Sequence, residues 1–176
     1  ADAQRLLRAG VLPANHWPGV VGETNLAAFG GLAGSTYLLH ECAETLDDDA
    51  LRAQRVTCLS QLRSQLTCTR LGADVISGAA GVANALAQAG SALGIDMTNE
   101  LTVLRDQVRD FAAHAAELGF AHGRFGAVAA LASINAELGV DDAEAVHLAR
   151  AAFDELNPAM LDSPARDSWC KGLPGV

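Results

Sequence analysis

The stretch Gly123-Arg124-Phe125-Gly126 opens an Ala-rich apolar segment, and the same Gly-x-x-Gly pattern recurs along the chain. The other copies start at Gly31, Gly78 and Gly172, so that consecutive copies are 47, 45 and 49 residues apart. A near-constant period of this size is typical of a repeated supersecondary unit. Because glycine lets backbone approach backbone or ligand closely, we expect the four loops to converge on one site.

Each period indicates an inner apolar helix followed by an outer amphipathic helix. We expect inner helices over 82–93 and 127–138, ended by Gly94 and Gly139. In the second period the apolar residues of the outer helix advance by three or four positions, as on one helical face. They are Met97, Leu101, Leu104, Val108, Phe111, Ala115 and Leu118.

The other two outer helices show start signals and apolar faces of the same kind. Asp47-Asp48-Asp49 supplies an acidic N-cap for the helix of the first period. Asp141, with Glu144 three residues later, resembles a capping box for the helix of the third period. The apolar face of the first-period helix is predicted at Val56, Leu59, Leu62 and Leu66.

No segment shows the sustained period-two alternation of strands, so the fold class is all-α. Helical hairpins with apolar inner and amphipathic outer helices stack side by side, and a closed array of them is an α/α toroid. Residues 1–176 supply about three hairpins and the start of a fourth, which predicts one domain in the form of a partial barrel.

The composition excludes several classes of protein. The chain of 176 residues is 50% hydrophobic but only 5% aromatic, which favours closely packed helices over a β-sandwich. A net charge of −9 argues against nucleic acid as a partner. No apolar run is long enough to span a membrane, and the four cysteines suggest no disulfide framework. We therefore expect a protein of the reducing cytoplasm.

Five residues beside the glycine pairs could carry chemistry. Asp74 precedes Gly78 by four positions, and His122 directly precedes Gly123. Before Gly172 stand three more candidates, Arg166, Cys170 and Lys171. Histidine is the usual general acid or base near neutral pH, and a cysteine near cations is a thiolate or a soft metal ligand.

Each candidate also has a purely structural interpretation when taken alone. Asp74 could cap the following helix, His122 could lie on the surface, Arg166 could pair with a nearby aspartate and Cys170 could pack beside Trp169. Because the candidates stand at the same corner of successive repeats, however, the functional interpretation is the better one.

Three motifs resemble those of the lanthionine synthetase C-like cyclases. The Asp-containing motif of that family resembles Asp74-Val75-Ile76-Ser77-Gly78-Ala79-Ala80-Gly81. Its Ala-His-Gly-x-x-Gly motif is similar to Phe120-Ala121-His122-Gly123-Arg124-Phe125-Gly126. The signature Arg-x-x-Ser-Trp-Cys-x-Gly-x-Pro-Gly-Ile/Val is similar to the segment Arg166-Asp167-Ser168-Trp169-Cys170-Lys171-Gly172-Leu173-Pro174-Gly175-Val176. The motifs occur in the order of the family, whose fold is an α/α barrel of helical hairpins.

The resemblance implies an enzyme that closes thioether rings in a precursor peptide. Such cyclases add a peptide cysteine thiol to dehydroalanine or dehydrobutyrine at a zinc ion, which is bound through the residue matched by Cys170 and a later Cys-His or Cys-Cys pair. His122 is then the acid/base, and Asp74 holds or polarises His122 or assists thiol deprotonation. Arg166 stabilises negative charge or orients Asp74.

This sequence departs from the family pattern at Lys171, where His or Tyr is common. Lys171 is then a proton donor or base, or a partner for a peptide carboxylate. We expect the remaining zinc ligands beyond Val176 and read the chain, which lacks an initiator Met, as the central part of a larger cyclase that is inactive alone. The parent is a separate cyclase or the cyclase domain of a class II lanthipeptide synthetase with a fused dehydratase.

Two other functions remain open from the residues. One is a non-catalytic helical scaffold that binds peptides. The other is a toroid glycosidase or terpene cyclase, which needs clustered carboxylates at the mouth of the barrel. The only acidic cluster, Asp47-Asp48-Asp49, stands in a helix cap at the other corner of the repeat.

Overall fold

The computed structural model describes residues 26–66 and 71–156, and this part of the chain forms six helices and no strand. The all-α prediction is therefore confirmed. No helix within these residues has the length and apolar character needed to cross a membrane. The helices are α2 (Leu32–Leu46), α3 (Asp49–Leu66), α4 (Ala79–Leu93), α5 (Thr98–His114), α6 (Arg124–Leu138) and α7 (Ala143–Asp154).

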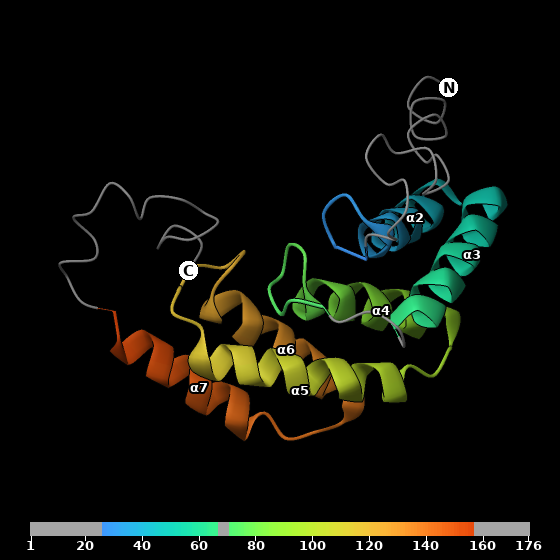
Figure 1. Ribbon diagram of the computed structural model, residues 1–176. Coiled ribbons are helices and arrows are strands. Elements are labelled where there is room, and N and C mark those ends of the chain that lie inside the picture. The colour runs from blue at the N-terminus through green and yellow to red at the C-terminus, as the bar shows by residue number, and fades with distance from the viewer. Residues whose placement is uncertain (1–25, 67–70, 157–176) are drawn as a thin grey trace.

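The helices form three hairpins that lie side by side in an arc (Figure 1). Helix α4 contacts both α2 and α6, so these three helices make a continuous inner layer. The inner helix α4 buries ten of its fifteen residues, whereas its outer partner α5 buries four of seventeen. Side chains of all six described helices meet in one apolar cluster, which includes Leu59, Leu86, Leu104 and Leu131. This burial pattern agrees with the inner and outer helices read from the sequence.

The inner helices begin three residues earlier than predicted, directly after the first glycine of each pair. Gly31, Gly78 and Gly123 are the N-cap residues, and none has a side chain with which to cap. Instead, the first helical amides donate to carbonyl groups seven residues earlier, for example from Ala79 to Gly72 at 2.8 Å and from Arg124 to Glu117 at 2.9 Å. The incoming loop thus satisfies the amides that a helix start leaves unpaired.

The inner helices end in equivalent left-handed residues. Gly94 and Gly139 have φ values of 63° and 64°, as their predicted C-cap role requires. The equivalent residue after α2 is Asp47, with φ 50°, the only non-glycine residue with positive φ in the described ranges. The repeat therefore extends to the backbone conformation of the turns.

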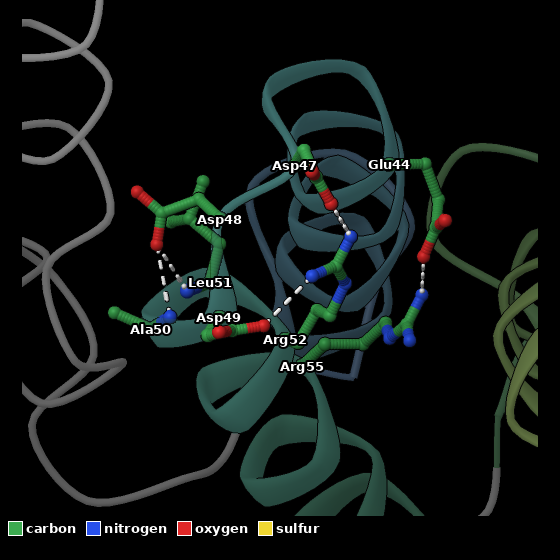
Figure 2. A network of polar contacts seen from close by, with 8 residues as sticks. All are labelled: Glu44, Asp47, Asp48, Asp49, Ala50, Leu51, Arg52 and Arg55. Carbon is green, nitrogen blue, oxygen red and sulfur yellow. Dashed lines mark hydrogen bonds and ion pairs between the residues drawn. The ribbon is translucent and has the colours of Figure 1, made fainter.

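Aspartates stabilise the starts of the outer helices (Figure 2). The Asp48 carboxylate accepts the amides of Ala50 and Leu51 at 2.9 and 3.2 Å, so the predicted acidic cap of α3 is present. Asp141 accepts the amide of Ala143 at 2.9 Å. The prediction of a capping box was wrong for Glu144, because this side chain pairs with Arg105 of α5 at 3.2 Å instead of bonding to the backbone at the start of α7.

The predicted apolar face of α3 was wrong at Val56, which is 43% exposed. Arg55 takes the buried position instead, and its side chain is 4% exposed. The guanidinium donates to Glu44 of α2 at 2.8 Å (Figure 2) and lies 2.9 Å from Nδ1 of His40. Because its head group is bonded to the neighbouring helix, arginine can occupy this apolar interface.

Candidate functional site

The loops that precede α2, α4 and α6 lie next to one another at one end of the hairpins, and we call this end the loop edge (Figure 1). Backbone hydrogen bonds join neighbouring loops. The amide of Phe29 donates to the carbonyl of Ile76 at 3.0 Å, and the amide of Val75 donates to that of Ala121 at 3.1 Å. The predicted convergence is confirmed for these three copies, while the copy at Gly172 lies outside the described residues.

The second glycine of each pair allows this close approach. A Cβ atom on Gly126 would overlap the carbonyl oxygen of Phe120 and would lie 2.8 Å from Cγ2 of Val75 in the neighbouring loop. A Cβ on Gly81 would likewise overlap the carbonyl of Val75 and approach the Ala28 side chain at 2.5 Å. The glycines therefore serve approach of backbone to backbone, within each loop and between loops.

Two predicted site residues meet across this contact. Oδ2 of Asp74, from the loop before α4, lies 3.1 Å from Nδ1 of His122, from the loop before α6. A carboxylate can only accept, so Nδ1 carries the proton and donates it to Asp74. The side chains are 20% and 33% exposed, which leaves the pair accessible from one side. Nε2 of His122 makes no hydrogen bond to any described residue and is therefore the nitrogen that can exchange a proton with a ligand.

Asp74 is held as a carboxylate by its neighbours. Partial burial opposes ionisation, but hydrogen bonds from the Ser77 amide, from His122 and from the Ser77 hydroxyl outweigh it and lower the pKa of Asp74 below its ordinary value. The Ser77 amide donates to Oδ1 at 2.6 Å. A carboxylate next to Nδ1 fixes the orientation and the tautomer of the imidazole ring.

The capping interpretation of Asp74 is not what the structure shows. The amides of Ala79, Ala80 and Gly81 at the start of α4 donate to the backbone carbonyls of Gly72, Ala73 and Asp74. The Asp74 side chain is thus left for Ser77 and His122. For the same reason the start of α4 offers no free amides of these three residues to an anion.

Arg124 directly follows the Gly123 N-cap and anchors the neighbouring helix. Its side chain is 11% exposed and forms a bidentate ion pair with Glu155, the C-cap residue that follows α7; one of the bonds is 2.8 Å long. Phe125 also contacts Phe153 of α7, with ring centroids 4.8 Å apart. These contacts hold the third hairpin together beside His122.

The other three predicted site residues, Arg166, Cys170 and Lys171, lie outside the described residues. Within 26–66 and 71–156, no group of three or more His, Cys, Asp or Glu side chains could hold a metal ion. Cys42 and Cys58 are free thiols there, and burial raises the pKa of both. This environment is that of structural thiols and not of reactive ones.

Ser77 and Arg124 also lie at the site, although neither was predicted from the sequence. Ser77 directly precedes Gly78, the position that His122 has before Gly123. The period therefore contained the signal, since residues at the same place in consecutive repeats face the same end. Nothing in the sequence indicated that Arg124 is buried, because its partner Glu155 comes from another helix.

The comparisons with known proteins agree with these motifs. The model of the family described as lanthionine synthetase C-like protein matches residues 5–176, which is nearly the whole chain. A search of curated proteins gave no match. With the family model covering the hairpins, the Gly-x-x-Gly loops and the Asp74–His122 pair, the chain belongs to the lanthionine synthetase C-like family.

Proposed function

We propose that this chain is part of a zinc-dependent cyclase that forms lanthionine and methyllanthionine rings in a dehydrated precursor peptide. The observation that supports the proposal best is the contact between Asp74 and His122, which come from neighbouring loops of the repeat, with Nε2 of His122 left for substrate. Membership of the lanthionine synthetase C-like family also supports a cyclase-like role.

The reaction needs one proton removed and one delivered. The sulfur of a peptide cysteine loses its proton to solvent and bonds to the β carbon of a dehydrated residue. The electron pair of the double bond forms an enolate, and its α carbon then takes a proton. His122 delivers that proton from Nε2, and the Asp74 carboxylate stabilises the imidazolium beforehand. Atoms and charges balance without an oxidant or a reductant.

Zinc enters the proposal through Cys170 and through ligands expected beyond Val176. When bound, zinc lowers the pKa of a coordinated thiol so that it reacts as thiolate near neutral pH. We propose that the metal lies at the end of the site that contains Cys170; the described residues contain no group of three or more His, Cys, Asp or Glu side chains that could hold it. Arg166 and Lys171 are proposed for the same end, to stabilise negative charge and to move a proton.

Cyclisation of a pre-dehydrated peptide by the full-length protein tests the role of His122. We expect His122→Asn to slow thioether formation about a hundred-fold or more. The rate is measured as the loss of free thiols from the peptide. His114→Asn is the matched control, because His114 is 76% exposed and pairs with Asp110 on the same helix. Equal rates in His122→Asn and the unmodified protein would remove His122 from the acid/base role.

Metal analysis of the full-length protein tests the zinc site separately. We expect stoichiometric zinc in the unmodified protein and in Cys58→Ala, and its loss in Cys170→Ala. Cys58 is a suitable control because it is a free, partly buried thiol of α3. Retention of zinc by Cys170→Ala would contradict the proposed ligand. Peptide binding without any thioether formation would instead favour the non-catalytic scaffold.

A further inference from the structure

Ser77 occupies the same place in its loop as His122 does in the next loop. Each residue directly precedes the first glycine of its pair, and Asp74 lies between the two side chains. Ser77 is exposed, and both its amide and its hydroxyl bond to the Asp74 carboxylate. Its contacts are therefore concentrated on the Asp74 carboxylate.

Ser77 bonds to both oxygens of that carboxylate. Its amide donates to Oδ1 at 2.6 Å, and its hydroxyl lies 3.2 Å from Oδ1 and 3.2 Å from Oδ2. Oδ2 is also the oxygen that accepts from Nδ1 of His122. Rotation of the carboxylate away from His122 would therefore break contacts to Ser77 as well.

We propose that Ser77 is a positioning residue, which fixes the plane of the Asp74 carboxylate so that Oδ2 holds Nδ1–H of His122 and leaves Nε2 for substrate. The role in catalysis rests on the proposed function, whereas the effect of Ser77 on Asp74 does not. Ser77 itself touches no reacting atom in this arrangement.

Two observations separate this role from an ordinary helix cap. The first amides of α4 already donate to the carbonyls of Gly72, Ala73 and Asp74, so the helix start does not use the Ser77 hydroxyl. Burial raises the pKa of Asp74, and of the effects that lower it the Ser77 amide bond is the largest, followed by the bond from His122 and then by the bond from the Ser77 hydroxyl. Among the described residues, His122 is the titratable group that faces this carboxylate.

The first test is an NMR titration of the Asp74 carboxyl carbon in the full-length protein without substrate. Ser77→Ala removes the hydroxyl and keeps the amide, and we expect the titration midpoint of Asp74 to rise. Ser77→Thr retains a hydroxyl and should restore the midpoint. Ser133→Ala is the matched control, because Ser133 is exposed on α6 and its hydroxyl bonds only to the Ala129 carbonyl.

The second test is the rate of cyclisation of a pre-dehydrated peptide. We expect Ser77→Ala to lower kcat roughly ten-fold with little change in KM, because the hydroxyl acts on the pair and not on the peptide. Ser77→Thr should recover most of the rate, and Ser133→Ala should retain all of it.

The outcomes of the two tests distinguish the two proposals. If the unmodified protein forms no thioether, the proposed function fails, and the titration still decides whether Ser77 controls Asp74. An unchanged Asp74 midpoint in Ser77→Ala overturns the inference, whatever the activity. So does a Ser77→Thr protein that stays as slow as Ser77→Ala while circular dichroism shows both to be folded.

Discussion

The two ends of the hairpins start their helices in different ways. At the loop edge, α2, α4 and α6 begin at glycines and receive no side-chain cap. At the opposite end, Asp48, Asp96 and Asp141 each accept an amide at the start of an outer helix. The acidic side chains of one end are therefore structural, whereas the backbone does the capping at the other.

This difference explains why chemistry can reside at the loop edge. Because loop carbonyls satisfy the amides of α4, Asp74 remains available for Ser77 and His122. At the opposite end, Asp47, Asp49 and Arg52 form an exposed network around the start of α3 (Figure 2). Substitutions at the two ends should accordingly have different effects, and four of them test the comparison.

Gly126→Ala should have the largest effect, because the loop edge depends on close approach of backbone to backbone. The added Cβ would overlap the Phe120 carbonyl, and backbone cannot rotate away as a flexible side chain can. We expect a loss of about 3 kcal/mol or more in the free energy of unfolding, measured with urea. Gly72→Ala is the control in a neighbouring loop, since a Cβ there meets nothing within 4 Å. Equal stability of the two variants would contradict the packing described for this edge.

Asp48→Ala tests the other end and should destabilise the protein by about 1 kcal/mol, the usual value of a lost N-cap. The reason is that the amides of Ala50 and Leu51 lose their acceptor. Thermal or urea unfolding measures the change. Asp49→Ala is the neighbouring control, and we expect little change because Asp49 is highly exposed and pairs only with Arg52 in the described structure. A larger loss at Asp49 would show that the ion pairs, and not the cap, stabilise this turn.

The acid dependence of stability tests whether Asp74 is held ionised at the loop edge. Since the pKa of Asp74 is lowered in the folded protein, its contribution is present above the unfolded value of about 3.9 and is lost as pH falls through the folded pKa. The difference in unfolding free energy between the unmodified protein and Asp74→Asn should therefore shrink as the pH falls below about 4. A difference that grows towards low pH would contradict the direction given for this pKa.

Asp47→Gly should have the smallest effect and should raise stability slightly. Asp47 has φ 50° at a place where the equivalent residues of the other hairpins are Gly94 and Gly139. Glycine relieves the left-handed conformation by at most about 1 kcal/mol, while the exposed ion pair to Arg52 is lost. Differential scanning calorimetry measures the net change. Gly94→Asp is the reverse substitution and should lower the melting temperature.

The helices could be predicted from the sequence because each signal is local. Gly94 and Gly139 end their helices as expected, and Leu101, Leu104 and Val108 lie on one buried face. The prediction failed where neighbours in space decide. Val56 and Arg55 are adjacent on α3, and the choice between them depends on Glu44 and His40 of another helix. Glu144 left its capping role for the same reason, because Arg105 lies within reach.

The candidate site divides in the same way. Asp74 and His122 could be selected from their places beside the glycine pairs, and the structure brings the two side chains together. Ser77 was overlooked although its place directly before Gly78 matches that of His122 before Gly123, and the structure shows that its hydroxyl contacts the Asp74 carboxylate. The roles of Arg166, Cys170 and Lys171 stay predictions, since these residues lie outside the described ranges.

The sequence by itself determined the repeat, the helical hairpins and the corner of the hairpins at which the candidate site residues Asp74 and His122 stand. These features follow from periodicity and from glycine, whose effects extend over a few residues along the chain. Only the tertiary structure decided which of those side chains touch. The bond from the Val75 amide to the Ala121 carbonyl aligns two loops, and this alignment places Asp74 3.1 Å from His122. Such distances depend on packing between segments far apart in the sequence, which no local pattern encodes.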